Sequence, residues 1–285
     1  MKKKKSNLTT ILIVLIFFVG LSLLLYPTVS DYWNSFTQSQ AIGKYAEAVA
    51  DIDEEKYTEI WDEAYAYNEE LCERGNMYIM SDADKIRYNQ LLNVSGNGVM
   101  GYIEIPAINV SLPIYHGTND TVLQVAVGHL EGTSLPVGGT GSHCVVSGHR
   151  GLPRAKLFTD LDKLMVGDVF IFRVLNEILT YEVDQILIVD PHEVSALVID
   201  PEQDYCTLVT CTPYGVNSHR MLVRGHRVEN TEEAKVVRVT ANAIQIEPLL
   251  VAPVVAAPIL LVLLIALLFP RRQRHRGRSK KHENS

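Results

Sequence analysis

Cysteine is scarce in this sequence, and the spacing of the few cysteines excludes the common zinc sites. The four cysteines form no C-x-x-C pair, and no histidine stands at zinc-site spacing from them. Internal repeats are absent, and low-complexity sequence is confined to the basic ends. The sequence therefore predicts no structural metal. An even number of cysteines leaves a disulfide open for an exported protein.

A net positive charge is confined to the two ends of the chain. The formal net charge of −7 comprises +4 in residues 1–7, +6 in residues 270–285 and −17 in between. Nucleic-acid phosphates need a basic face, so the acidic central region argues against a nucleic-acid partner. The basic ends instead suit anionic lipid headgroups.

Two long runs lack any charged residue. Residues 8–26 and 249–269 are 19 and 21 residues long, each about 30 Å of helix and so long enough to cross a bilayer. Basic residues flank the outer end of each run, so the positive-inside rule predicts a two-pass cell-membrane protein with cytoplasmic termini and residues 28–248 outside. No A-x-A-like cleavage site follows the first run, which favours a retained anchor over a signal peptide.

Between these runs, the hydrophobic pattern changes from helical to strand-like. Apolar residues recur every three or four positions in residues 41–71, which predicts two amphipathic helices with Asp53 as an N-cap and Gly75 as a stop. Residues 76–98 contain turn signals and are expected to be irregular. Short strands are expected at residues 100–105, 144–147, 169–174, 179–189, 206–210 and 220–228. Many short strands separated by turn residues favour a closed β-barrel.

Cys211 is the candidate nucleophile. It follows the apolar, β-branched strand at residues 206–210, and Pro213 and Gly215 end that strand in a turn. A lone cysteine on a strand is more often a small core residue than a reactive group. The residues around it must therefore decide between the two interpretations.

His149 and Arg220 are the candidate partners of Cys211. His149 follows the strand at residues 144–147, and Arg220 opens the strand after the Cys211 turn, so the three side chains can meet on one rim of a barrel. A thiolate attacks an acyl carbon, imidazole carries protons to and from the amines, and a guanidinium stabilises an oxyanion or holds substrate carbonyls. This combination predicts acyl-transfer chemistry.

Other residues of the region compete for these roles. His129 is the strongest rival to His149, and His219 is expected to support Arg220. Arg224 lies four strand positions, about 13 Å, beyond Arg220, and Cys206 should face the opposite side of the strand from Cys211. The remaining candidates are expected to be structural or on the surface: His116, His143, His226, Cys72 and Cys144.

Three motifs around these residues resemble the catalytic motifs of the sortases, most closely those of the class C, pilus-assembling branch. They are Ser147-Gly-His-Arg-Gly151, Thr207-Leu-Val-Thr-Cys-Thr-Pro-Tyr-Gly215 and Asn217-Ser-His-Arg-Met-Leu-Val-Arg-Gly225. Further similarity lies in residues 100–106, 112–118, 128–136 and 151–160. The resemblance covers residues 99–228, with the helical lead-in and the C-terminal anchor.

The resemblance implies a mainly β fold, a closed eight-stranded sortase-type β-barrel with an N-terminal helical region, flanked by two transmembrane helices. The expected divisions are a basic cytoplasmic tail (1–7), a transmembrane helix (8–26), the helical region with a lid (31–98), the catalytic barrel (99–230), a linker (231–248), a second transmembrane helix (249–269) and a second basic cytoplasmic tail (270–285).

The resemblance also implies a cysteine transpeptidase acting outside a Gram-positive cell. Cys211 would cleave a Leu-Pro-x-Thr-Gly-like sorting signal between Thr and Gly and hold the product as a thioester. A pilin lysine would then resolve the thioester into an isopeptide bond. His149 would be the general acid and base, Arg220 would hold substrate or stabilise the oxyanion, and Thr210 would assist at the oxyanion. No cofactor is needed, because the thioester stores the energy of the cleaved bond.

The sequence departs from the class C pattern in the lid. The branch typically carries an Asp-Pro-Phe or Asp-Pro-Trp motif that plugs the active site, and residues 76–98 contain no such tripeptide. Asp82 and Asp84 lie in the expected lid region, but neither is followed by Pro and an aromatic residue. How a lid would be anchored therefore stays open.

Three alternatives remain. A sortase that attaches proteins to cell-wall peptidoglycan is the nearest, although housekeeping sortases typically lack the C-terminal span. A papain-like hydrolase usually has its cysteine before its histidine, the reverse of the order here. A membrane-tethered binding or scaffold protein is the non-enzymatic alternative.

Overall fold

The computed structural model describes residues 7–74, 80–153 and 155–230. Among these residues, those from Val29 onward form one compact unit, and the apolar start of the first helix, up to Thr28, belongs to another. Three longer helices precede the strands: α1 (Asn7–Ala50), α2 (Glu54–Arg74) and α3 (Asp82–Gln90). The short helix α4 (Asp120–Leu123) and three 3-10 turns, Pro106–Ile108, Leu161–Lys163 and Ser195–Leu197, lie between strands.

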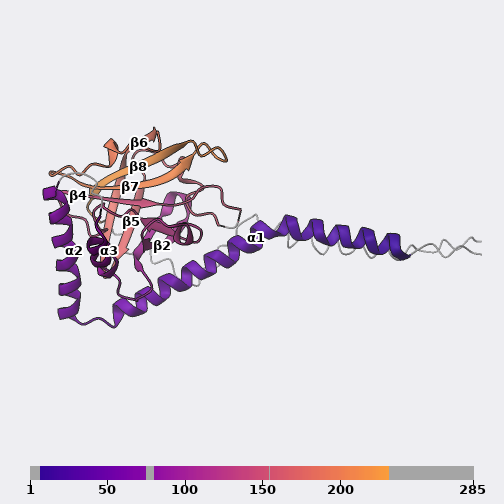
Figure 1. Cartoon of the computed structure of the whole chain (residues 1–285), viewed down its shortest axis with the longest axis horizontal. Coiled ribbons are helices and arrows are strands. Elements are labelled where there is room, and N and C mark those ends of the chain that lie inside the picture. The colour runs from indigo at the N-terminus through magenta and orange to yellow at the C-terminus, as the bar shows by residue number, and fades with distance from the viewer. Residues whose placement is uncertain (1–6, 75–79, 154, 231–285) are drawn as a thin grey trace, which may run out of the picture. The chain divides into compact units, whose positions relative to one another are not determined.

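Eight strands close into a barrel, as expected (Figure 1). They are β1 (Val99–Ile105), β2 (Val110–His116), β3 (Val127–His129), β4 (Ser142–Ser147), β5 (Val169–Val174), β6 (Glu177–Val189), β7 (Asp204–Thr212) and β8 (His219–Val228). Their order around the barrel is β1-β2-β3-β4-β7-β8-β6-β5. The strand pattern in the sequence did not reveal β2, which contains Pro113, or β3, which has only three residues. Proline and shortness both weaken a strand signal.

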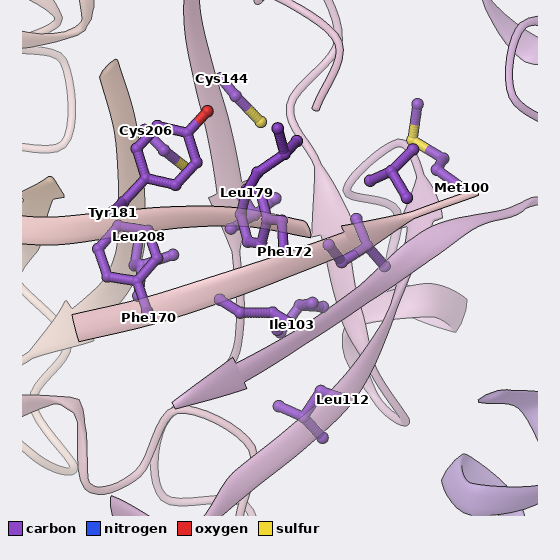
Figure 2. Close-up of a cluster of buried hydrophobic side chains, with 14 of the residues drawn as sticks. Met100, Ile103, Leu112, Cys144, Phe170, Phe172, Leu179, Tyr181, Cys206 and Leu208 are labelled. Carbon is purple, nitrogen blue, oxygen red and sulfur yellow. The ribbon is translucent and has the colours of Figure 1, made fainter. Parts of the chain in front are cut away.

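The interior of the barrel is filled by alternate residues of the strands (Figure 2). Phe170, Phe172 and Tyr181 pack together, with the Phe170 and Tyr181 rings stacked 5.6 Å apart between centroids. Cys206 and Leu208 of β7 point into this core and are fully buried. Because side chains alternate along a strand, Cys211 projects from the other face of β7, as predicted for the pair Cys206 and Cys211.

Helix α1 runs without interruption through Pro27, so the predicted span at residues 8–26 and the following amphipathic helix are one helix. By length and composition, its segment Leu12–Ala50 is the one helix in the described part of the chain that is able to cross a membrane. The predicted second span, residues 249–269, lies outside the described residues.

The helices α2 and α3 differ in how well the sequence predicted them. The backbone N–H of Lys56 donates to the Asp53 carboxylate at 2.8 Å, which confirms the predicted cap of α2. The expectation that residues 76–98 are irregular is wrong for residues 82–90, which form α3. Ser81 and Asp84 cap its start reciprocally. This capping box is a helix signal that the turn-forming residues around it obscured.

Buried hydrogen bonds join two of the helices to the barrel. The Tyr45 hydroxyl of α1 donates to the Met100 carbonyl at 2.9 Å and accepts from the Leu175 N–H at 2.8 Å. The Asn68 side chain of α2 exchanges two bonds with the backbone of Leu135, at 2.7 and 3.1 Å. Each side chain pairs backbone groups that would otherwise be buried unsatisfied. The helical region is therefore part of the same folded unit as the barrel rather than a loose stalk.

Candidate active site

Cys211 and Arg220 lie on neighbouring strands at the same end of the barrel. β7 and β8 pair antiparallel, and their register puts Cys211 opposite Arg220. Directly opposed residues have Cβ atoms about 4.5–5.5 Å apart. Both residues are half-buried, so solvent and substrate reach them. The structure thus brings together two of the three residues singled out in the sequence.

His149 is carried to the same place by β4. β4 pairs in parallel with β7, with Ser147 opposite Val209. The pairing continues beyond the strand, because the Gly148 N–H donates to the Val209 carbonyl at 3.0 Å. Extending the same register by two residues from Ser147 and Val209 sets His149 level with Cys211. Gly148 has to be glycine, because an added Cβ would lie 2.7 Å from the Phe158 ring.

Thr210 supports this arrangement from inside the barrel. Its side chain is buried, and its hydroxyl donates to the Gly148 carbonyl at 2.8 Å. The hydroxyl proton is therefore already used in a hydrogen bond to Gly148, the residue before His149. The expected help at the oxyanion would have to come from a backbone group rather than from this side chain.

Arg220 is held by the loop that precedes it. One terminal nitrogen of its guanidinium donates to the carbonyls of Asn217 and His219, at 3.2 and 3.1 Å. A guanidinium has five N–H donors, so these two bonds orient the group without exhausting it. The remaining donors are chemically suited to a carbonyl or an oxyanion.

All four cysteines are free thiols in the structure, which answers the open question of a disulfide. Cys144 and Cys206 are register partners on β4 and β7 and are fully buried. Burial raises the pKa of the Cys206 thiol well above its ordinary value, so it stays protonated. Cys211 and Cys72 are half-buried, and Cys211 is the one that lies opposite Arg220 in the strand register.

His129 and His143, two rivals of His149, are built into the structure. His129 is fully buried, with Nδ1 2.8 Å from the Tyr88 hydroxyl and Nε2 2.8 Å from the Ser134 carbonyl. His143 bonds through both ring nitrogens as well, to the Val198 carbonyl and the Thr207 hydroxyl. Burial lowers the pKa of His143. Neither imidazole is placed to carry protons to a substrate.

The other rivals also have different positions or partners. His116 lies 2.9 Å from the Gly98 carbonyl and 2.8 Å from the Leu91 carbonyl, and burial lowers its pKa. Arg224 pairs with Asp184 at 2.9 and 3.0 Å and stacks over the Tyr205 ring. The exposed His219 bonds to its neighbour Ser218, and the half-buried His226 pairs with Tyr205 on β7, toward the far end of the barrel from Cys211.

The two aspartates of the expected lid region lie at the start of α3. The Asp84 carboxylate accepts from the Ser81 N–H at 3.1 Å as part of the helix cap. Further along α3, Arg87 forms a two-bond ion pair with Glu70 of α2, at 2.8 and 2.9 Å. Tyr88 is fully buried against β2 and β3. These contacts tie α3 to other elements than β7 and β8, which carry Cys211 and Arg220.

Arg150, which follows His149 directly and is largely buried, was not predicted from the sequence. Its guanidinium forms an ion pair with Asp162 and lies over the Tyr214 ring. The only signal in the sequence was its place inside the Ser147–Gly151 motif. In the described ranges, no group of three or more His, Cys, Asp or Glu side chains is placed to hold a metal ion.

Comparisons with known proteins point to one family. Residues 103–228 match the sortase domain model. The chain is 32% identical over 131 residues to sortase D of Bacillus subtilis (strain 168), and this match covers 45% of the chain and 63% of that relative. It is 30% identical over 117 residues to sortase A of Streptococcus agalactiae serotype III (strain NEM316), covering 40% of the chain and 47% of that relative. The chain thus spans less than two thirds of the length of these two curated relatives.

Solved structures match over more of the chain. The crystal structure of sortase C1 from Streptococcus agalactiae superposes with a TM-score of 0.66 at 51% identity, over 67% of this chain and 100% of that one. The sortase C structure from Streptococcus pneumoniae gives 0.61 at 43% identity, over 67% of this chain and 97% of that one. Together with the barrel and the position of Cys211, these matches establish that the chain belongs to the sortase family of cysteine transpeptidases, with class C sortases as structural neighbours.

Proposed function

We propose that this protein cleaves a Leu-Pro-x-Thr-Gly-like sorting signal between Thr and Gly and transfers the acyl group to a lysine amine of a pilin, so that pilus subunits are polymerised. The observation that carries the proposal is the convergence of Cys211, Arg220 and His149 at one end of the barrel. A nucleophile, a cation and a proton carrier at one accessible site are the requirements of acyl transfer through a thioester.

In the first half of the reaction, the Cys211 thiolate adds to the Thr carbonyl carbon of the substrate. Arg220 stabilises the negative oxygen that forms. His149 gives a proton to the nitrogen of Gly as the Thr–Gly bond breaks, so the Gly-bearing fragment leaves as a neutral amine. The Thr acyl group remains on the sulfur as a thioester.

In the second half, the acceptor amine adds to the thioester carbonyl carbon. His149, now neutral, takes a proton from the attacking nitrogen. The carbon–sulfur bond breaks, Cys211 is regenerated as a thiolate and an amide bond is formed. No diffusible cofactor enters this scheme, because the thioester conserves the energy of the cleaved peptide bond.

The proposal places the catalytic unit outside the cell, held to the membrane by the start of α1. The apolar composition of residues 12–26 supports this anchor. The proposed second anchor at residues 249–269 rests on its uncharged sequence and the basic residues that follow it. Both termini would then be cytoplasmic.

The experiment for the proposed function is incubation of the detergent-purified full chain with candidate pilins that carry a sorting signal. We expect ladders of covalent polymer that resist denaturation and that are absent with Cys211→Ala. Product formed only with a cell-wall cross-bridge amine would favour the peptidoglycan alternative. Polymer formed by Cys211→Ala would contradict the enzymatic proposal.

A further inference from the structure

Side-chain hydrogen bonds link the neighbours of His149 to the neighbours of Cys211 on both sides of the pair. On one side, the Thr210 hydroxyl donates to the Gly148 carbonyl at 2.8 Å. These are the residues just before Cys211 and His149. On the other side, a terminal nitrogen of Arg150 donates to the Thr212 hydroxyl at 3.5 Å. Arg150 and Thr212 are the residues just after the pair.

The contacts of Arg150 reach further than this one bond. Its guanidinium carbon lies 6.0 Å from the centroid of the Tyr214 ring, within cation–π range, and its other terminal nitrogen pairs with Asp162. Gly151 also packs closely against Tyr214, so closely that an added Cβ would lie 2.7 Å from that ring. Arg150 therefore connects the loop that carries His149 with the turn that follows Cys211.

Stability alone does not explain an arginine at this position. The side chain is only 10% exposed, and among the described residues its Nε has no hydrogen-bond partner. A buried donor without an acceptor is unfavourable, so an apolar side chain of similar length would avoid a cost. What an apolar side chain cannot do is hold Thr212, Asp162 and the Tyr214 ring at once. That requires the planar, multidentate guanidinium.

We propose that Arg150 is a positioning residue, which fixes the backbone of His149 against Cys211 through Thr212 and Tyr214. It acts through His149 and does not itself contact the reacting atoms. This inference rests on the proposed catalytic roles of Cys211 and His149. Acyl transfer is sensitive to such positioning, because a displacement of about 1 Å between reacting groups can cost about 100-fold in rate.

The test is a kinetic comparison of full-length variants on a fluorescent sorting-signal peptide. With Arg150→Met we expect kcat to fall about 10- to 100-fold with KM within about twofold, because substrate contacts stay while the proton carrier is displaced. Arg150→Lys keeps a cation beside Asp162 but lacks the planar fork, so it should recover only part of kcat. Arg224→Met is the matched control, since Arg224 also pairs with an aspartate and stacks on a tyrosine. It should leave kcat unchanged.

Two further variants keep the proposal testable if Arg150→Met does not fold. Thr212→Val removes the hydroxyl acceptor from a β-branched strand residue, and Tyr214→Leu removes the ring from an exposed turn position. Each of these two substitutions should also lower kcat, but by a smaller factor than Arg150→Met. A double variant, Arg150→Met with Thr212→Val, should lose little more than Arg150→Met alone, because the two residues act as one unit.

Three outcomes would overturn the proposal: a folded Arg150→Met with wild-type kcat, a loss of kcat no larger than that of Arg224→Met, or a change confined to KM. Failure of the proposed function is recognised separately. In that case the wild-type chain itself would not cleave the peptide, and its Cys211 would not react with a sorting-signal probe.

Discussion

Two regions in the described part of the chain set a histidine near a cysteine, and we propose that the one at the rim of the barrel carries out chemistry. Under α3, His129 contacts Tyr88 and Ser134 through its two ring nitrogens and is fully buried near Cys144. At the rim of the barrel, His149 follows the end of β4 and is half-buried, and the register of β4 with β7, extended by two residues, sets it level with Cys211. Residue types are similar in the two places, so burial and hydrogen-bond partners distinguish the structural histidine from the one that we propose is catalytic.

The largest expected difference is between the two cysteines of β7. Cys211→Ala should lower the acyl-transfer rate by at least about 10⁴-fold, as expected when the nucleophile of a covalent mechanism is removed. Cys206→Ala should leave kcat within about twofold and lower the free energy of unfolding by about 1 kcal/mol or more, because it creates a small cavity in the core. Peptide-cleavage kinetics and urea denaturation measure the two effects. A large loss of kcat in Cys206→Ala would contradict the assignment of Cys206 to the core and of Cys211 alone to the reaction.

Two of the arginines of β8, Arg220 and Arg224, offer the next comparison. Arg220→Ala should reduce kcat by about 100- to 1,000-fold, the usual cost of losing a donor to a developing oxyanion. Arg224→Ala removes the ion pair with Asp184 and should cost about 1 kcal/mol of stability while kcat stays unchanged. Steady-state kinetics with the same peptide provide the measurement. Equal losses of kcat in the two variants would show that Arg220 has no special role.

A substitution among the buried, hydrogen-bonded residues Tyr88 and His129 should lower stability and leave the reaction rate unchanged. Tyr88→Phe deletes the hydroxyl that bonds to His129 Nδ1 and accepts from the Gly117 N–H at 3.1 Å. Leaving buried polar groups unpaired should lower the free energy of unfolding by about 1–3 kcal/mol. Thermal or urea unfolding measures the loss. If Tyr88→Phe instead lowered kcat with normal stability, α3 would be linked to catalysis.

The smallest expected effect is a pH dependence of stability from the buried histidines. Burial lowers the pKa of His116 and His143 in the folded state, so both are favoured as neutral groups. Their contribution is present above the unfolded-state pKa of about 6.5 and is lost as the pH falls below it. Unfolding free energies measured from pH 7.5 to 5 should therefore decrease. His143→Gln should make this decrease shallower, and an unchanged slope would contradict the assignment.

Much of the barrel was predictable because its strands carry their own signals. β5 was predicted with its observed ends, residues 169–174, and β7 and β8 were predicted within two residues at either end. β2 and β3 were not, since Pro113 interrupts one and the other is too short to show a period. α3 was missed because turn-forming residues surround its capping box. Local signals identify an element only when the element is long enough and not interrupted.

The candidate site was partly predictable for a related reason. Cys211 and Arg220 flank one short turn of a hairpin, so their proximity follows from local sequence. His149 joins them through the parallel pairing of β4 with β7, which are separated by more than 50 residues. That register is set by the packing of the whole barrel, so it is not readable from either strand alone. The contacts of Arg150 depend on the same long-range pairing and were invisible in the sequence.

The most direct test of the claim that Cys211 is the nucleophile is to identify which cysteine reacts covalently with a substrate analogue. A sorting-signal peptide with a thiol-reactive group in place of the scissile bond is incubated with the full chain, and the adduct is located by peptide mass spectrometry. We expect one adduct, on Cys211, that is lost in Cys211→Ala, while Cys72, Cys144 and Cys206 remain unmodified. An adduct on another cysteine, or undiminished labelling of Cys211→Ala, would contradict the claim.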